Sequence, residues 1–438
     1  MKLGNTAYLG VDYCDTPDDV ITPYCAHGPT ILFRRYLKDR PSRKFFACAV
    51  HRTKKGCPFF QWVDSSIDKK RQAANLKTFE RNKRKNKWKR LRNRLKSFIN
   101  YTSDECRRVC LTCETLLLSD ETNEHKTHTI QQCISVQQLL QPSRIFLPDR
   151  ERTSFAQEYF TSSTLQVIND NISELGVKRV ICIGTPTLHE SILSDSSRDV
   201  CTFLLDLDPK YGQFFNPNLY QRFNLFNTHF YSSNGAVKLQ NFISSTELSL
   251  VLVVLDIPFG AKVDVIYSSL QRLWKLVGWN ESVLTGGVPT LWIFPYFNGT
   301  EIIQKTNFCM LQYRVKYEYK YAKCKRGSPV RIFTNIPIQQ FKLPTRSNEY
   351  KFCEDCNMFV FTNASHCSKC NSCESADGCS NHHCDTCGKC VKESFKHCLR
   401  CRVCHPVNVA CLAPEDTRSK CHICKDYSHK RRQCPYNT

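Results

Sequence analysis

Cysteines and histidines recur along this chain at the short spacings that bind zinc. The 438 residues include 28 cysteines and 13 histidines. A C-x2-C pair presents two thiolates to one ion, and four sulfur or nitrogen ligands complete a tetrahedral site, so the spacing predicts about six zinc ions. The predicted ligands are Cys25, His27, Cys48 and Cys57; Cys110, Cys113, His125 and His128; Cys353, Cys356, His366, Cys367, Cys370, Cys373, His383, Cys384, Cys387, Cys390, His397, Cys398, Cys401 and Cys404; and Cys421, Cys424, His429 and Cys434.

Two of these clusters leave alternatives open. The gap between His125 and His128 is shorter than in a C2H2 finger, which favours a structural clip over a DNA reader; Cys106 and Cys133 are alternative ligands there. In the C-terminal field the pattern HC-x2-C-x2-C occurs three times, and Cys411 adds a further thiol. The field has few apolar residues, so bound metal must supply its folding energy, with about three ions whose ligand pairing the sequence leaves open.

A second kind of chemistry is indicated by Asp256-Ile257-Pro258-Phe259, which follows an apolar run. An amino group on a nucleic-acid base is a poor nucleophile because its lone pair is delocalised into the ring. The Asp256 carboxylate and the Ile257 carbonyl could both accept hydrogen bonds from that amino group, which favours a pyramidal nitrogen ready to attack a methyl donor. Phe259 could stack on the base, and Pro258 would stiffen the loop. These four residues are the predicted catalytic group.

The elements that position this motif are predicted to form a parallel α/β sheet. Apolar runs Val177–Gly184, Thr202–Asp208, Leu248–Asp256 and Val288–Phe297 alternate with helix-length segments. The first run ends in Gly184, where a cofactor could approach the backbone, and the second contains Asp206, placed to hold ribose hydroxyls. Open α/β sheets bind ligands at the carboxyl ends of their strands, so these residues should lie near Asp256.

The charge of the chain favours a polyanionic partner. Lys and Arg number 62 against 40 Asp and Glu, a net charge of +22, and neutralised phosphates release counterions. The stretch Lys83–Lys96 is the most basic and is predicted to be a solvated helix, a nuclear targeting signal or an arm on RNA phosphates. No apolar stretch is long enough to span a membrane, and no signal peptide is evident, so an intracellular location is expected.

Several modules resemble known families. Residues 20–66 resemble a GRF-type zinc finger, with Arg34, Arg35, Arg43 and Lys44 beside aromatic residues that we expect to be exposed, and residues 418–438 have the spacing of a CCHC knuckle. Both kinds bind single-stranded nucleic acid. Residues 350–412 resemble the cysteine-rich domain of DHHC palmitoyltransferases, but Asn381 replaces the motif's Asp, so Cys384 is predicted to bind zinc rather than carry an acyl group.

The order of modules resembles the family of CCHC-zinc-finger methyltransferases that form N6-methyladenosine on large-subunit ribosomal RNA. That resemblance implies a Rossmann-like class I methyltransferase domain over residues 133–340, flanked by small zinc-stabilised domains, with a basic arm at 67–104 and a C2H2-like site at 105–132. The family's motif is Asp-Pro-Pro-Phe, and this chain has Ile257 at its second position.

The resemblance also implies S-adenosyl-L-methionine as cofactor, ribosomal RNA as partner, no membrane association, and a location in the nucleus, nucleolus and cytoplasm. The residues it places around the cofactor are Ser154, Phe155, Ala156, Gln157, Gly184, Asp206, Asn224, Leu225 and Phe226. Two alternatives stay open: an inactive RNA-binding scaffold, and the same chemistry on DNA adenine or protein glutamine. Protein partners are left open.

Overall fold

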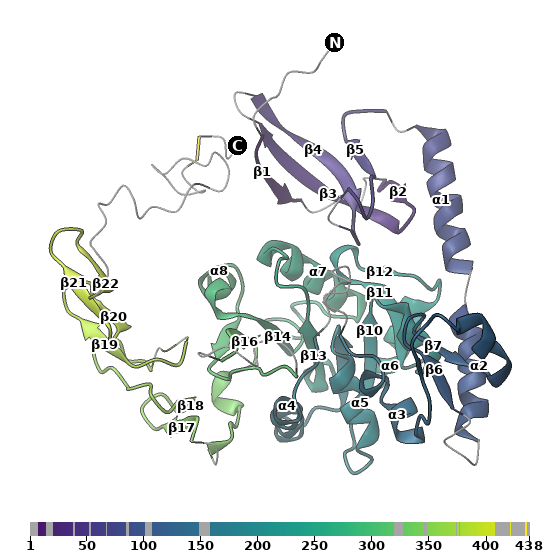
Figure 1. The fold of residues 1–438 in the computed structure, drawn as a ribbon. Coiled ribbons are helices and arrows are strands. Elements are labelled where there is room, and N and C mark those ends of the chain that lie inside the picture. The colour runs from purple at the N-terminus through teal and green to yellow at the C-terminus, as the bar shows by residue number, and fades with distance from the viewer. Residues whose placement is uncertain are drawn as a thin grey trace. The chain divides into compact units, whose positions relative to one another are not determined.

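The chain divides into two units in a computed structural model, Glu80–Leu343 and Met1–Phe79 with Pro344–Thr438. The structure describes residues 8–14, 21–37, 40–51, 54–66, 68–84, 87–100, 107–148, 158–318, 327–345, 348–373, 375, 377–407, 421 and 434–435. Figure 1 shows the ribbon, with the large sheet of the first unit in teal and green. Among the described residues, no helix combines the length and apolarity needed to cross a bilayer.

The large unit is built on an eight-stranded, mostly parallel sheet. Its spatial order is β12-β11-β10-β9-β13-β14-β16-β15, in which β9, β10, β11, β13 and β14 are parallel. The strands are β9 (Arg179–Ile183), β10 (Cys201–Asp206), β11 (Tyr220–Asn224), β12 (His229–Phe230), β13 (Val251–Asp256), β14 (Thr290–Pro295), β15 (Cys309–Leu311) and β16 (Val330–Thr334).

Each of the four predicted apolar runs overlaps one strand of this sheet, namely β9, β10, β13 and β14, although β10 begins one residue before its run. Continuous apolar runs are typical of parallel strands, because helices cover both of their faces. The run at Leu248 was predicted too long, since Leu248–Leu250 is a 3-10 turn and the strand begins at Val251.

Helices cover the two faces of the sheet. The helices are α3 (Val136–Leu140), α4 (Ser162–Glu174), α5 (Pro186–Ser194), α6 (Gly235–Ile243), α7 (Val263–Leu276) and α8 (Gly299–Lys305). Buried residues of α6 and α7 join one core cluster with alternate residues of β9, β10 and β13. The intervening residues face α5, where His189 Nδ1 lies 3.0 Å from Thr202 Oγ1. Both faces of the sheet are therefore covered, and the ends of its strands remain available to bind ligands.

The predicted basic arm forms two helices, α1 (Lys69–Arg84) and α2 (Lys87–Ile99). A solvated helix is a wrong prediction for α2, because Leu91, Leu95 and Phe98 are buried along one side, the spacing of an amphipathic helix. This side packs against the short helix η4 (Pro209–Gln213) and strand β7 (Thr115–Leu117). Arg94 makes a two-pronged ion pair with Glu121, with both nitrogen–oxygen distances 2.5 Å. This ion pair therefore links α2 to the segment that follows β7.

The smaller sheets belong to the zinc modules. An N-terminal sheet contains β1 (Tyr8–Tyr13), β2 (Tyr24–Cys25), β3 (Gly28–Leu37), β4 (Arg40–Cys48) and β5 (Phe60–Trp62), and a three-stranded sheet contains β6 (Arg108–Cys110), β7 and β8 (Ile130–Gln131). The C-terminal field consists of three hairpins: β17 (Tyr350–Cys353) with β18 (Met358–Phe361), β19 (Asn381–Cys384) with β20 (Lys389–Lys392), and β21 (Phe395–Cys398) with β22 (Val403–Pro406).

A buried carboxyl group should make the stability of the large unit depend on pH. Burial raises the pKa of Glu190 in α5 to about 8, although the carboxyl accepts hydrogen bonds from the Ser143 amide, at 3.0 Å, and hydroxyl. The folded state then holds a proton that the unfolded chain releases near its ordinary pKa, so stability falls as pH rises from about 4.5 to 8.

We therefore expect Glu190→Gln to raise the melting temperature by several degrees, on the order of 5 °C at pH 8.5, and by less at pH 5. Differential scanning calorimetry at both pH values measures this. Glu247→Gln, at an exposed position, is the matched control. An equal effect of Glu190→Gln at both pH values would contradict the assignment.

Candidate active site and zinc centres

Three predicted site residues lie in one row across the sheet. In the pairing of β9 with its two neighbours, Ile183 lies opposite Leu205 of β10 and opposite Leu255 of β13. The next residues along these strands are Gly184, Asp206 and Asp256. The parallel register therefore brings Gly184, Asp206 and Asp256 to the same edge of the sheet.

Gly184 has a backbone conformation and an environment that exclude a side chain. Its φ is +64°, and a Cβ atom built on it would lie 2.5 Å from the carbonyl oxygen of Asp256. Its amide donates to the Leu205 carbonyl at 3.0 Å. The chain then enters α5 with Pro186 in its first turn, which suits a helix start because proline lacks an amide donor. The backbone at Gly184 is thus in direct contact with the backbone of the predicted catalytic motif.

The second motif position uses its side chain for packing. Ile257 is 7 % exposed and belongs to the core cluster between the sheet and α7. Its contribution to a site is therefore its backbone carbonyl, which any residue supplies. The Pro258 carbonyl accepts a hydrogen bond from the Ala261 amide at 3.1 Å, which closes the turn after the motif. This explains how isoleucine fits where the related motif has proline.

Phe259 is partly buried and held edge-on to a second aromatic ring. Its ring centroid lies 5.8 Å from that of Phe294, at an interplanar angle of 88°. Phe294 belongs to β14 and is fully buried. Edge-to-face contact fixes the orientation of the outer ring. The Phe259 ring is therefore already oriented before any ligand binds.

The acids after β10 have different partners. Asp206 is 5 % exposed, and its Oδ1 accepts a hydrogen bond from the Asp208 amide at 2.8 Å. The Asp208 carboxylate pairs with the buried Lys210 ammonium at 2.9 Å. Sequence reasoning missed Lys210, and the signal available was its position two residues after Asp208. The Asp208 carboxylate therefore has a structural role, as the partner of the Lys210 ammonium.

The third predicted segment, Asn224–Phe226, follows β11. The Asn224 side chain is buried and accepts from the Phe226 amide at 3.1 Å, while Leu225 packs into the core cluster and Phe226 against its edge. Predicted residues Ser154, Phe155, Ala156 and Gln157 lie outside the described residues. The chain is described again from residue 158, and the Tyr159 hydroxyl donates to the Phe146 carbonyl at 2.7 Å.

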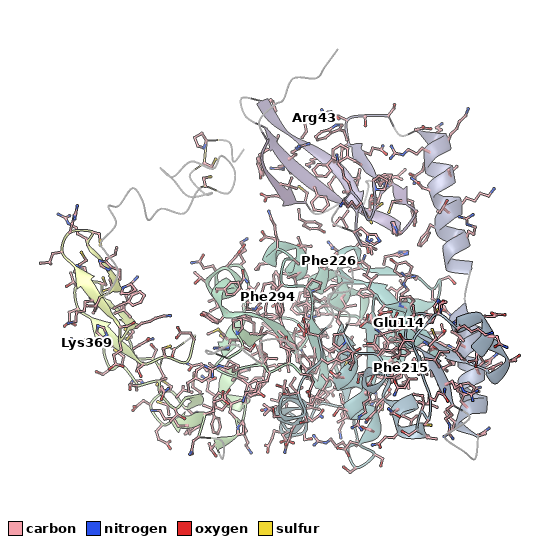
Figure 2. The ribbon with its side chains drawn as sticks, viewed as in Figure 1. Arg43, Glu114, Phe215, Phe226, Phe294 and Lys369 are labelled. Carbon is pink, nitrogen blue, oxygen red and sulfur yellow. The ribbon has the colours of Figure 1, made fainter. Side chains whose placement is uncertain are left out.

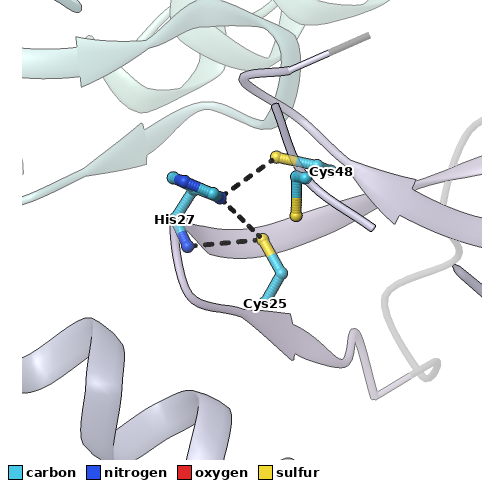
Figure 3. Close-up of side chains that lie close together, drawn as sticks. Cys25, His27 and Cys48 are labelled. Carbon is cyan, nitrogen blue, oxygen red and sulfur yellow. Dashed lines mark hydrogen bonds between the residues drawn. The ribbon is translucent and has the colours of Figure 1, made fainter. Parts of the chain in front are cut away.

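The first zinc cluster joins Cys25, His27, Cys48 and Cys57, whose ligand atoms lie within 4.8 Å of one another. Figure 3 shows His27 Nδ1 between two thiols, 4.0 Å from Cys25 Sγ and 3.8 Å from Cys48 Sγ. Tetrahedral zinc sets this separation at about 3.6 Å. A small core of Leu32, Phe46 and Phe59 packs beside the ligands, so the donor set fits a structural zinc ion.

The aromatic residues of this module divide into two groups. Phe45, Phe46 and Phe59 are among the aromatic residues that we expected to be exposed, but they are buried, and Phe46 and Phe59 pack with Leu32 in the core beside the ligands. At the surface, the Arg43 guanidinium lies 4.1 Å from the Trp62 ring centroid and pairs with Asp64. Figure 2 marks Arg43 on this sheet. Fewer aromatic side chains of this module are therefore exposed than predicted.

The second cluster joins Cys110, Cys113, His125 and His128. Cys113 Sγ lies 3.6 Å from His125 Nδ1 and 3.3 Å from His128 Nδ1. The segment before the histidines is a seven-residue 3-10 helix, η2 (Ser119–His125), too short for a DNA-recognition helix. The alternative ligand Cys133 is exposed and outside this cluster, and Cys106 lies outside the described residues. The short 3-10 helix therefore favours a structural metal site, called the clip below, over a DNA-reading finger.

The clip is hydrogen-bonded to η4, the segment that connects β10 and β11 of the large sheet. The Gln213 amide group donates to the Glu114 carbonyl at 2.7 Å and accepts from the Leu116 amide at 3.2 Å. Glu114 also lies 3.4 Å from the Lys210 ammonium. The zinc clip is thereby fastened to η4, the segment that follows Asp206 and Asp208.

The C-terminal field pairs its ligands across repeats. The three clusters are Cys353, Cys356, His366 and Cys373; Cys367, Cys370, His383 and Cys390; and Cys384, Cys387, His397 and Cys404. In each of these three clusters a C-x2-C pair joins a histidine and a cysteine from the following repeat. The neighbours His366 and Cys367 therefore serve different ions, as do His383 and Cys384. This interleaving supplies the pairing that the sequence left open.

Two ligands of the predicted CCHC knuckle, Cys421 and Cys434, are described and buried. Cys424 and His429, together with Cys411 of the preceding field, lie outside the described residues.

Removing a ligand of the clip should destabilise the large unit. We expect Cys113→Ser to release about one zinc ion per chain and to lower the melting temperature by about 5 °C or more, because η4 loses its hydrogen-bonded support. Zinc analysis and calorimetry measure both changes. Cys133→Ser, at an exposed position, is the control, and an unchanged melting temperature of Cys113→Ser would contradict the supporting role.

Comparison with known proteins places these sites in a family. A model described as probable N6-adenine methyltransferase matches residues 151–326, and one described as GRF zinc finger matches residues 23–66. The human rRNA N(6)-adenosine-methyltransferase ZCCHC4 is 37% identical over 431 residues, covering 95% of this chain and 83% of the human protein. The mouse protein of that name is 37% identical over 427 residues, covering 94% and 82%. The Xenopus laevis protein is 35% identical over 380 residues, covering 83% and 76%. With this identity over most of both chains, the chain belongs to the ZCCHC4 family of rRNA N(6)-adenosine-methyltransferases.

Proposed function

We propose that this chain methylates N6 of an adenosine in large-subunit ribosomal RNA, using a Rossmann-like class I methyltransferase domain at 133–340. The observation that carries the proposal is the row of Gly184, Asp206 and Asp256 at the carboxyl ends of adjacent parallel strands. The strand order supports the fold assignment, because the chain reverses direction across the sheet between β9 and β13. Ligands of open α/β sheets bind at such a switch point.

The residues beside β9, β10 and β11 fit S-adenosyl-L-methionine as the bound cofactor. The left-handed backbone at Gly184 lets a ligand approach the chain without a side chain in the way. Asp206 is the acid placed to accept hydrogen bonds from ribose hydroxyls, and Asn224–Phe226 lie at the end of the next strand. When bound there, the cofactor supplies an electrophilic sulfonium methyl group.

The motif after β13 acts on the acceptor. The Asp256 carboxylate and the Ile257 carbonyl accept hydrogen bonds from the adenine amino group and favour a pyramidal nitrogen. The Phe259 ring, fixed against Phe294, stacks on the base. Gly184 lies against the Asp256 carbonyl, so the same contact sets the distance between donor site and acceptor site. Catalysis is then mainly positioning.

The zinc modules are proposed to hold RNA around the target nucleotide. The chain's net charge of +22 and the Arg43–Trp62 stack suit phosphate and base contacts with single strands. We propose a GRF finger at 20–66, a C2H2-like clip at 105–132, a cysteine-rich field at 350–412 and a knuckle at 418–438, with about six zinc ions in all. A nuclear, nucleolar and cytoplasmic location would follow from a ribosomal RNA substrate.

Transfer of labelled methyl groups to ribosomal RNA tests the function. We expect Asp256→Ala to lower the rate at least about 100-fold, because the amino group loses its acceptor, while RNA affinity is unchanged. The product is identified as N6-methyladenosine by mass spectrometry of digested RNA. Asp264→Ala, a surface acid of α7 paired with Lys305, is the control. A wild-type chain that binds RNA without labelling it would instead be an inactive scaffold.

A pair of glycine variants separates the close approach at Gly184 from backbone strain. Gly176 has nearly the same φ, +65°, but an added Cβ would meet nothing within 4 Å. Both alanine variants should lose about 1 kcal/mol of stability from the left-handed conformation. We expect only Gly184→Ala to lose methyl transfer, by more than about tenfold, because its Cβ displaces the Asp256 carbonyl. Equal activity of the two variants would refute the positioning role.

A further inference from the structure

The last hairpin of the C-terminal field has metal-binding side chains on both faces. Cross-strand partners share a face, and neighbours along a strand alternate. His397 lies opposite Cys404, and these two residues belong to the third cluster. Cys398 lies opposite Val403, and Lys396 opposite His405. Cys398 and His405 are therefore together on the other face.

The turn after Cys398 has the backbone of a zinc-binding turn. In four C-x2-C pairs both cysteines belong to the same ligand cluster. The residue after the second cysteine of each pair has a left-handed conformation. These residues are Glu114, Asn357, Asn371 and Gly388, with φ between 47° and 61°. Arg402, which follows Cys398-x2-Cys401, has φ 56°. A left-handed arginine is uncommon, so the turn is shaped for the two thiols.

His405 presents one ring nitrogen to this face. Its Nδ1 lies 3.1 Å from the Pro406 carbonyl oxygen, a contact that places the proton on Nδ1 and leaves Nε2 as an acceptor. Nε2 is shielded from solvent, and the described residues offer it no hydrogen-bond partner. The ring also contacts the Cys398 thiol. A histidine oriented in this way by a carbonyl is typical of a metal ligand.

We propose that Cys398, Cys401 and His405 bind an additional zinc ion, separate from the ion held by His397 and Cys404. In the three clusters described above, the C-x2-C pair receives its histidine from the following repeat. Within the described residues no hairpin follows β22, and His405 supplies the nitrogen from its own strand. The corresponding residue of the preceding hairpin is Val391, opposite His382. Three ligands leave the fourth position of the tetrahedron to another thiolate or to water.

Zinc analysis of the full chain tests whether Cys398 and Cys404 serve different ions. We expect Cys398→Ser and Cys404→Ser each to remove about one zinc ion, and the double variant about two, from a wild-type content of about seven. If Cys398 shared the ion of Cys404, the double variant would lose no more zinc than Cys404→Ser alone, and the proposal would be wrong.

A second measurement keeps the test valid if Cys404→Ser unfolds the hairpin. In the cadmium-substituted full chain, a site with two sulfurs and one nitrogen gives a cadmium NMR resonance distinct from those of the Cys3His sites. His405→Asn should abolish that resonance alone, and His382→Asn should keep it. Retention of every cadmium resonance in His405→Asn would overturn the proposal. Both measurements report metal content, so they are independent of methyl transfer.

Discussion

The contact between the Gly184 backbone and the Asp256 carbonyl is the constraint on which the catalytic unit depends. The two residues end neighbouring parallel strands, and only a residue without a side chain leaves the carbonyl where it lies. The strands are fixed by buried apolar residues on both faces, so the approach is maintained by the whole core rather than by the loops. Placing both halves of a site on a rigid sheet gives the accuracy that methyl transfer requires.

The zinc modules are stabilised in a different way from the large sheet. The C-terminal field has few apolar residues, and its two-stranded sheets would not be stable alone. In the clip, metal ligation and hydrogen bonds through Gln213 fasten a three-stranded sheet to η4, and the buried face of α2 covers the same region. Metal binding and hydrophobic packing therefore both stabilise the segment that follows Asp206 at the end of β10. In the C-terminal hairpins the ligand clusters take the place of a core.

Much of the sheet was predictable because buried parallel strands have continuous apolar sequences, and the register then places Gly184, Asp206 and Asp256 in one row. The membership of the first two zinc clusters also follows from spacing. Other features depend on tertiary context. The burial of Leu91, Leu95 and Phe98 was hidden by the basic residues around them, and Phe45 and Phe59 are buried by the packing within their small module. The pairing in the C-terminal field could not be predicted, because adjacent His and Cys residues alternate between faces of a hairpin.

The interleaved ligands make the C-terminal field a linear array with nearest-neighbour coupling. The dipeptides His366-Cys367 and His383-Cys384 each contribute ligands to two successive clusters, so the geometry of one site restrains the backbone of the next. In such arrays the free energy of a unit depends on whether its neighbours are folded. Metal loss or thiol oxidation at one end should spread from site to site, and the field should lose its ions over a narrow range of chelator concentration instead of one by one.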